Sequence, residues 1–155
     1  MKLYELEVTQ KAPVPIQELW RFFSNANNLA KITPPALGFQ SHHLGKEEVH
    51  PGMIITHRVS PFPGIRLQWI TEISHVEAPF LFVDEQRFGP YRFWHHQHHF
   101  TEIPGGTLIT DRIHYGLSFG WLGQMAHPIL VRPQLEKIFA YRKKAVEEIF
   151  GLMHS

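Results

Sequence analysis

Residues 91–115 read YRFWHHQHHFTEIPGGTLITDRIHY, two runs of alternating side chains on either side of Pro104-Gly105-Gly106. Alternation with a period of two is typical of a β-strand that buries one of its faces. Adjacent proline and glycine residues supply the backbone angles of a tight turn. The stretch therefore predicts two strands, residues 91–102 and 107–115, which pair as an antiparallel hairpin.

The chain before and after this hairpin predicts further strands and three helices. Residues 2–9 alternate in the same way and predict a first strand. Apolar residues at helical spacing predict a short helix over 16–23, a second short helix that Asn25 caps and that reaches Lys31, and a long helix over 129–150. Segments between Pro/Gly turns predict four more strands, at 37–44, 52–59, 65–76 and 80–87.

This order of elements predicts an α+β fold. We expect a curved antiparallel β-sheet wrapped around a long C-terminal α-helix, with two short helices after the first strand. The 155 residues provide for this one domain, residues 1–155, and leave no room for a second. Because a curved sheet and a single helix do not close tightly on each other, we also expect a cavity between them.

Charge balance and the lack of cysteine exclude several classes of protein. Lys and Arg number 15 and Asp and Glu 14, so the chain lacks the dense positive charge of a nucleic-acid-binding protein. The absence of Cys excludes a disulfide scaffold, a thiol nucleophile and cysteine-held metal clusters. No apolar run resembles a signal peptide or reaches the ~20 residues of a membrane span. We expect a cytoplasmic protein without stable membrane insertion.

Short motifs along nearly the whole chain carry a resemblance to a known family. They are residues 13–20 with Phe22-Phe23, Ile32-Thr33-Pro34-Pro35, residues 82–86, Gly89-Pro90-Tyr91, residues 94–100, Gly105-Gly106-Thr107, Asp111-Arg112, Tyr115 and residues 139–142. Together with the order of elements, they are similar to the START-like helix-grip superfamily, also called SRPBCC, in its polyketide cyclase/dehydrase and lipid-transport branch. The resemblance implies an internal cavity for a hydrophobic small molecule, often lipid-like or polycyclic. It implies no catalytic motif, so the site has to be derived from the residues themselves.

Four histidines lie within five residues of the predicted strand 91–102, and alternation divides them into two pairs. The face with more apolar bulk, which we expect to point inward, carries Trp94, His96, His98 and Phe100. We expect His95 and His99 to face solvent. A turn of even length pairs residue 100 with 111 and residue 98 with 113, and it brings Ile109, Asp111, Ile113 and Tyr115 to the same inward face.

An apolar wall with a few convergent polar groups is typical of a ligand pocket. The predicted ligand-binding residues are Trp94, His96, His98, Phe100, Asp111, Ile113, Tyr115 and Arg142. Four of these are also candidate catalytic residues, because an imidazole titrates near neutrality and a carboxylate fixes its tautomer: His96, His98, Asp111 and Tyr115. The alternative is that these polar groups only satisfy one another beneath the helix.

A metal held by His96, His98 and Asp111 is a further alternative, since two histidines at i and i+2 of one strand reach the same ion. Their spacing matches no closed zinc signature, and we expect neither a metal nor a cofactor.

For several other residues the pattern leaves two interpretations open. Asp84 and Gln86 lie on a strand whose two faces are equally apolar, so they point either into the pocket or to solvent. Trp69 is expected to fill the core, as are Trp20 and Phe23, which could also close one end of the pocket. Arg142 reaches either a carboxylate, which we favour, or an acidic ligand. Residues 117–125 form either a connection that packs Phe119 and Trp121 on the core, the favoured interpretation, or a flexible segment that opens as a lid over the cavity or touches a membrane during ligand exchange.

The sequence thus predicts a protein that binds a hydrophobic or lipid-like small molecule. One alternative is a cyclase, dehydratase or isomerase that uses His96 or His98 with Asp111 and Tyr115. Another is a regulatory interaction protein with a vestigial pocket. Because no nucleophile elbow, phosphate-binding loop or dinucleotide fingerprint is present, the sequence does not support hydrolysis through a serine, kinase chemistry or nicotinamide redox chemistry.

Overall fold

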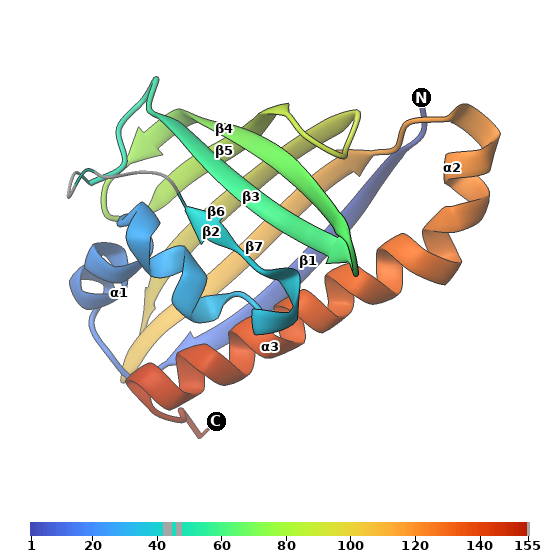
Figure 1. Cartoon of the computed structure of the whole chain (residues 1–155). Coiled ribbons are helices and arrows are strands. Elements are labelled where there is room, and N and C mark those ends of the chain that lie inside the picture. Colours follow the sequence, from blue (N-terminus) through green and yellow to red (C-terminus); the bar gives the residue numbers. More distant parts are fainter. Residues whose placement is uncertain (42–44, 46–47, 155) are drawn as a thin grey trace.

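The computed structural model describes residues 1–41, 45 and 48–154, and its framework is a seven-stranded sheet (Figure 1). All neighbouring strands are antiparallel, in the order β1-β7-β6-β5-β4-β3-β2. The strands are β1 (Leu3–Ala12), β2 (Gln40–Ser41), β3 (Ile54–Phe62), β4 (Ile65–Glu77), β5 (Leu81–Phe88), β6 (Phe93–Ile103) and β7 (Gly106–Gly116). The predicted α+β class with a long C-terminal helix is therefore confirmed.

The long helix lies along one side of the curved sheet, and shorter helices close one end (Figure 1). Helix α3 (Arg132–Phe150) has Pro133 as its second residue. It continues α2 (Gly120–Ala126) and a π-helical turn, η3 (His127–Val131). The short elements after β1 are α1 (Ile16–Phe23) and the 3-10 helices η1 (Ala26–Ile32) and η2 (Pro35–Leu37). Asn25 caps η1 as predicted, since its Oδ1 accepts from Asn27 N at 3.0 Å.

The β6–β7 hairpin differs from the prediction in register but not in the facing of its side chains. Ile103 pairs with Gly106, so the turn has only the two residues Pro104 and Gly105, the latter at a φ of 82°. His98 therefore pairs with Asp111, two residues from the expected partner. A shift of two keeps every side chain on its predicted face, because the strand period is two.

The predicted strand 37–44 is largely absent from the described residues. Only Gln40 and Ser41 are extended, and Leu37 belongs to η2. The fixed φ of Pro35 at the first position of η2 favours the helical turn. Residues 42–44 of this prediction lie outside the described residues.

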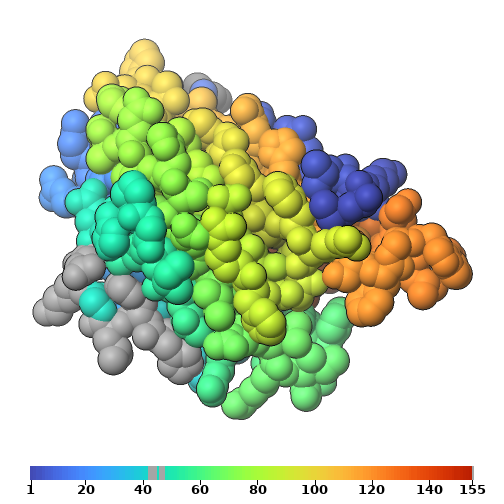
Figure 2. Space-filling model, turned by 90° about the horizontal axis from the view of Figure 1, so that it is seen from above, coloured from blue at the N-terminus to red at the C-terminus, as the bar shows by residue number. Residues whose placement is uncertain are grey.

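Two apolar clusters form the core, one at each end of the inner face. One joins α1 and η1 to the end of α3 and includes Trp20, Phe82, Phe100 and Val146. The other joins β1, β6 and β7 to the beginning of α3 and includes Leu6, Ile113, Tyr115 and Leu135. The outer face of the sheet is uncovered, as Figure 2 shows. No helix among the described residues is both long enough and apolar enough to span a membrane.

Candidate functional site

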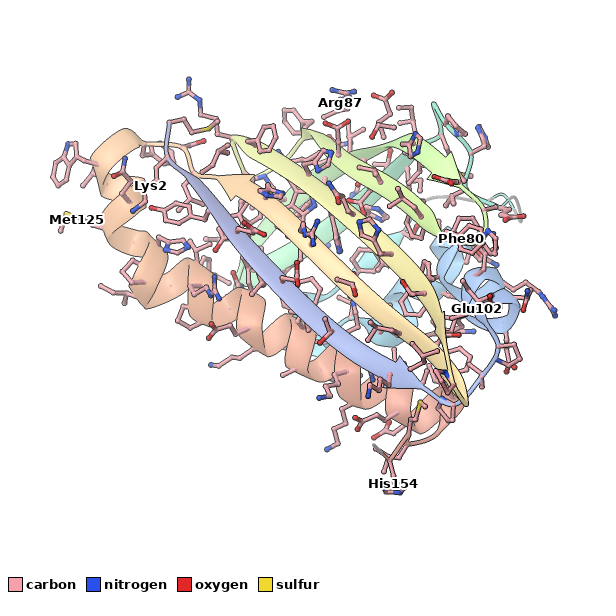
Figure 3. The ribbon with its side chains drawn as sticks, turned by 180° about the vertical axis from the view of Figure 1, so that it is seen from behind. Lys2, Phe80, Arg87, Glu102, Met125 and His154 are labelled. Atoms are coloured by element: carbon pink, nitrogen blue, oxygen red, sulfur yellow. The ribbon has the colours of Figure 1, made fainter. Side chains whose placement is uncertain are left out.

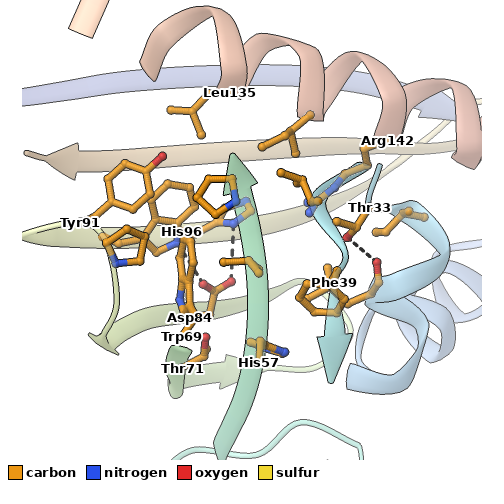
Figure 4. Close-up of a pocket in the computed structure, with 18 of the residues that line it drawn as sticks. Thr33, Phe39, His57, Trp69, Thr71, Asp84, Tyr91, His96, Leu135 and Arg142 are labelled. Carbon is orange, nitrogen blue, oxygen red and sulfur yellow. Dashed lines mark hydrogen bonds and ion pairs between the residues drawn. The ribbon is translucent and has the colours of Figure 1, made fainter. Parts of the chain in front are cut away.

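A cavity of about 520 Å³ lies between the sheet and α3. Figure 4 shows Leu135 and Arg142 entering it from the helix, while Asp84 and His96 enter from the sheet. Most of its wall is apolar, with side chains from α1, η1, η3, α3 and strands β3 to β6. Because β5 and β6 are neighbours, their inward polar side chains meet at one place on that wall.

That polar place is a cluster of Asp84 from β5, His96 and His98 from β6, Asp111 from β7 and Arg142 from α3. His98 Nε2–H donates to Asp84 Oδ2 at 2.5 Å, and His96 Nε2–H donates to Asp111 Oδ1 at 2.7 Å. The other ring nitrogens also lie near carboxylates: His96 Nδ1 is 3.5 Å from Asp84 Oδ2, and His98 Nδ1 is 3.3 Å from Asp111 Oδ1. Arg142 Nη1 reaches Asp111 Oδ1 at 3.5 Å.

These contacts shift the pKa of each acid and each imidazole. Burial alone raises the pKa of Asp84 and of Asp111, but the imidazoles, with Arg142 beside Asp111, outweigh it, so both carboxyls have a lowered pKa and stay ionised. Burial lowers the pKa of His96, and the neighbouring His98 lowers it further. Burial also opposes the charged form of His98, yet the two adjacent carboxylates, Asp111 and Asp84, raise its pKa. His98 is therefore the imidazole of the pair that holds a proton more readily.

Comparison with known proteins defines the fold. No family model matches the chain. No curated protein matches it either. Among solved structures, the protein CV1439 of Chromobacterium violaceum superposes with a TM-score of 0.71 at 11% identity, over 96% of this chain and 98% of that one. TTHA0849 of Thermus thermophilus gives 0.68 at 17% identity over 94% and 95%, and norcoclaurine synthase of Thalictrum flavum gives 0.68 at 13% over 96% and 96%. The chain has the START/Bet v 1-like helix-grip fold.

Within this helix-grip fold, four of the eight predicted ligand-binding residues line the cavity. They are Trp94, His96, His98 and Arg142. Phe100, Asp111, Ile113 and Tyr115 point to the predicted inner face but are not among the residues that line the cavity. For Phe100, Ile113 and Tyr115 the reason is that helices cover the inner face at both ends of the sheet, so an inward side chain there contacts core instead of open space.

The four residues that do not line the cavity differ in what they contact. Phe100 packs against Trp20 of α1, with ring centroids 5.9 Å apart, and Ile113 lies in the core cluster with Leu135. The Tyr115 hydroxyl hydrogen-bonds to His127 Nε2 at 2.7 Å and so anchors the π-helical turn. Asp111 lies behind the two histidines, where it fixes their orientation.

Asp84 and Gln86 of β5, whose direction the sequence left open, have different roles in the structure. Asp84 lines the cavity with 18% of its side chain exposed, and Trp94 Nε1 donates to its Oδ1 at 3.3 Å. Gln86 closes the turn between β5 and β6 instead. Its Nε2 donates to Tyr91 O at 2.6 Å, and its Oε1 accepts from Tyr91 N at 3.1 Å.

Several residues of the wall were not expected from the sequence. Trp69, expected to be core, is half-buried and lines the cavity with its ring at 90° to that of Trp94. His57, Thr71 and Tyr91 line it as well. Alternation with Ile73 was the available signal for Trp69 and Thr71, but strand parity cannot separate a filled core from an open cavity.

The remaining expectations concern the surface. His95 and His99 lie on the outer face of β6 and are half-buried there. Within residues 117–125, Phe119 and Trp121 do not pack on the core. Their side chains are 83% and 68% exposed. Phe119 adopts a φ of 67° at the start of α2, and this turn directs the helix away from the sheet (Figure 3, near Met125).

Proposed function

We propose that this protein binds a hydrophobic or lipid-like small molecule in the cavity between the sheet and α3. A volume of about 520 Å³ lies within the range of small-molecule sites, which is roughly 300–1,000 Å³. The apolar wall would hold the body of the molecule. The polar cluster of Asp84, His96 and His98 would receive an oxygen-bearing end group.

The observation that carries this proposal is the position of the cluster within an otherwise apolar wall. Buried polar groups in a purely structural role are normally enclosed by their partners. Here His98 donates to Asp84 and His96 donates to Asp111, while Asp84, His96 and His98 also border open space. A vestigial pocket, the alternative with an interaction protein, would leave less room than a drug-sized molecule requires.

An enzyme on the same scaffold is the second candidate. His98 lies between two carboxylates, an arrangement that suits proton transfer to or from a ligand oxygen. A structural neighbour at 13% identity is norcoclaurine synthase, whose structure holds a transition-state analogue. The substrate would be polyketide-like, and His96 or His98 would act as acid or base with Asp111 as the orienting group.

Filling the cavity tests the binding proposal. Leu67→Trp adds bulk to a residue that lines the cavity, and Gln68→Trp adds the same bulk to the exposed neighbour on the other face of β4. With an environment-sensitive apolar fluorophore as probe, we expect Leu67→Trp to lose at least tenfold in affinity and Gln68→Trp to bind as wild type. Equal affinity in both variants would contradict the proposal. Mass spectrometry of molecules extracted from the purified protein then identifies the ligand class.

The same molecules distinguish a carrier from an enzyme. If His96→Ala and His98→Ala bind the extracted ligand normally but no longer convert it, the enzyme alternative holds. If their affinity falls and wild type never converts the ligand, the protein is a carrier.

A further inference from the structure

Three potential metal ligands converge on the cavity side of the cluster. Asp84, His96 and His98 each offer one donor atom, and these atoms all lie within 4.8 Å of one another. The register of the sheet creates this group, because Asp84 pairs with His96 and His98 follows two residues later on the same face. Histidine nitrogen and carboxylate oxygen are the donors that zinc and its first-row neighbours take in proteins.

The tautomers favour a cation between these donors. Because His96 directs its Nε2 hydrogen to Asp111, the neutral ring presents a lone pair at Nδ1. That lone pair faces the ionised Asp84 Oδ2 at 3.5 Å, so two acceptors are opposed across a gap. A metal cation placed in the gap would be coordinated by both acceptors, His96 Nδ1 and Asp84 Oδ2.

A shared outer partner supports both histidines. Each histidine has one ring nitrogen near Asp84, and its other ring nitrogen lies near Asp111 Oδ1. The second distance is 2.7 Å from His96 Nε2 and 3.3 Å from His98 Nδ1. Metal-binding histidines characteristically donate their second N–H to a carboxylate, which fixes the tautomer and the ring orientation. Arg142 balances the charge of that carboxylate from the side of α3.

We propose that Asp84, His96 and His98 bind one divalent first-row transition-metal ion of the zinc type, with an open coordination position toward the cavity. From the sequence we expected no metal, with Asp111 as the third ligand of the alternative. The inward direction of Asp84, which the sequence left open, supplies a different third ligand and makes Asp111 the outer partner of the histidines.

The two distances to Asp84 lie close to what such an ion requires, and the three donor atoms, all within 4.8 Å of one another, would draw together around it. Metal–ligand bonds near 2.1 Å separate neighbouring donors by roughly 3.0–3.4 Å. The 3.5 Å between Asp84 Oδ2 and His96 Nδ1 is close to this range. The 2.5 Å hydrogen bond from His98 to Asp84 opens by roughly 1 Å or less as the ion replaces its proton.

The sum of the local charges indicates what the open position takes. With neutral imidazoles, the charges of Asp84, Asp111 and Arg142 sum to −1. A dication changes the sum to +1. The loaded site therefore favours an anionic oxygen, such as hydroxide, or a carboxylate or enolate of a cavity ligand. The metal proposal itself does not depend on the hydrophobic ligand, and its test uses the ion alone.

The chain provides a matched control within the same strand. His95 and His99 are a second pair of imidazoles on β6, but they lie on its outer face. A histidine-rich strand can hold nickel or zinc adventitiously through them. Removing both in a His95→Ala/His99→Ala variant leaves the proposed ligands intact.

The experiment titrates chelator-treated protein with Zn²⁺ against a competing chromophoric chelator, and with Co²⁺ read by visible absorption. We expect one ion per chain for wild type and for the His95→Ala/His99→Ala variant. We expect Asp84→Asn to lose at least tenfold in affinity together with the cobalt absorption of a low-coordinate site. Asp111→Asn, which changes the outer partner, should lose about 10–100-fold.

Equal Zn²⁺ affinity of wild type and Asp84→Asn would overturn the proposal, as would binding that disappears in the His95→Ala/His99→Ala variant. The second result identifies an adventitious ion only. Asp84→Asn keeps the shape of a side chain that is 18% exposed, so the variant is expected to fold, and its circular dichroism melt checks this.

Discussion

His96 donates its Nε2 hydrogen to Asp111 Oδ1 at 2.7 Å, although the strand register places Asp111 opposite His98. The contact is diagonal, and it has a counterpart across the other neighbour strand. Asp84 lies opposite His96 but accepts from His98 at 2.5 Å. The two crossed hydrogen bonds connect β5, β6 and β7 and hold both imidazoles in fixed orientations beside the cavity.

Replacing Asp111 should destabilise the protein strongly. Asp111→Asn removes the charge that His96, His98 and Arg142 face, and it leaves the guanidinium buried without a carboxylate. Breaking a buried ion pair in this way costs roughly 3–5 kcal/mol. The measurement is the free energy of unfolding in urea for the metal-free protein.

Glu7→Gln is the control for that variant. Glu7 pairs with Arg112 at 2.8 Å, but both side chains are more than 40% exposed. Such surface pairs contribute about 0–1 kcal/mol. Equal losses in the two variants would mean that the buried cluster contributes no more than a surface ion pair.

The stability contribution of His98 should depend on pH. His98 lies beside Asp84, His96 and Asp111, with Arg142 in contact with Asp111, and the two carboxylates, Asp111 and Asp84, raise its pKa despite burial. A raised folded-state pKa stabilises the native protein fully below the unfolded value of about 6.5, and this stabilisation is lost as the pH rises through the folded value. We therefore expect the difference in unfolding free energy between wild type and His98→Gln to shrink from pH 6 toward alkaline pH.

For this titration the matched control is His99→Gln on the outer face. Burial lowers the pKa of His99, and Arg112 lowers it further, so this group contributes with the opposite sign. Any difference between wild type and His99→Gln should grow, or remain level, as the pH rises from 6. A His98→Gln difference that follows the same course would contradict the assignment of the proton to His98.

Tyr115→Phe separates a structural hydroxyl from a catalytic one. The variant loses the 2.7 Å hydrogen bond to His127 Nε2, which costs about 0.5–1.5 kcal/mol of stability. Because Tyr115 does not line the cavity, binding of the apolar fluorophore and conversion of any extracted ligand should remain as in wild type. If Tyr115→Phe kept the wild-type melting temperature but no longer converted the ligand, the hydroxyl would be catalytic and not structural.

Phe100→Ala tests whether the aromatic core ends where the cavity begins. Phe100 is 2% exposed and packs against Trp20, Phe23 and Phe82. Truncation of a buried phenylalanine costs about 3–5 kcal/mol. We expect that loss in the unfolding free energy, with fluorophore affinity unchanged below the melting temperature. A comparable loss of affinity at full folding would place Phe100 in the binding site.

The sequence by itself determined the order of most elements, residues 37–44 apart, and which side chains of β6 and β7 point inward. Alternation along β6 and β7 is enough, because a period of two assigns each residue to a face even when the register is two residues off. The separation of His96 and His98 from His95 and His99 follows from this alone. The long C-terminal helix with Pro133 near its start and Gly151 at its end follows from helical spacing and capping.

Only the tertiary structure decided which inward residues border open space. Phe100, Ile113 and Tyr115 have the same parity as His96, yet α1 and the beginning of α3 cover them, and how helices cover a sheet is not a local property of the chain. The direction of Asp84 was likewise decided only by the tertiary structure. Its strand is apolar on both faces, so its direction depended on pairing with β6, and that pairing brought it to the histidines.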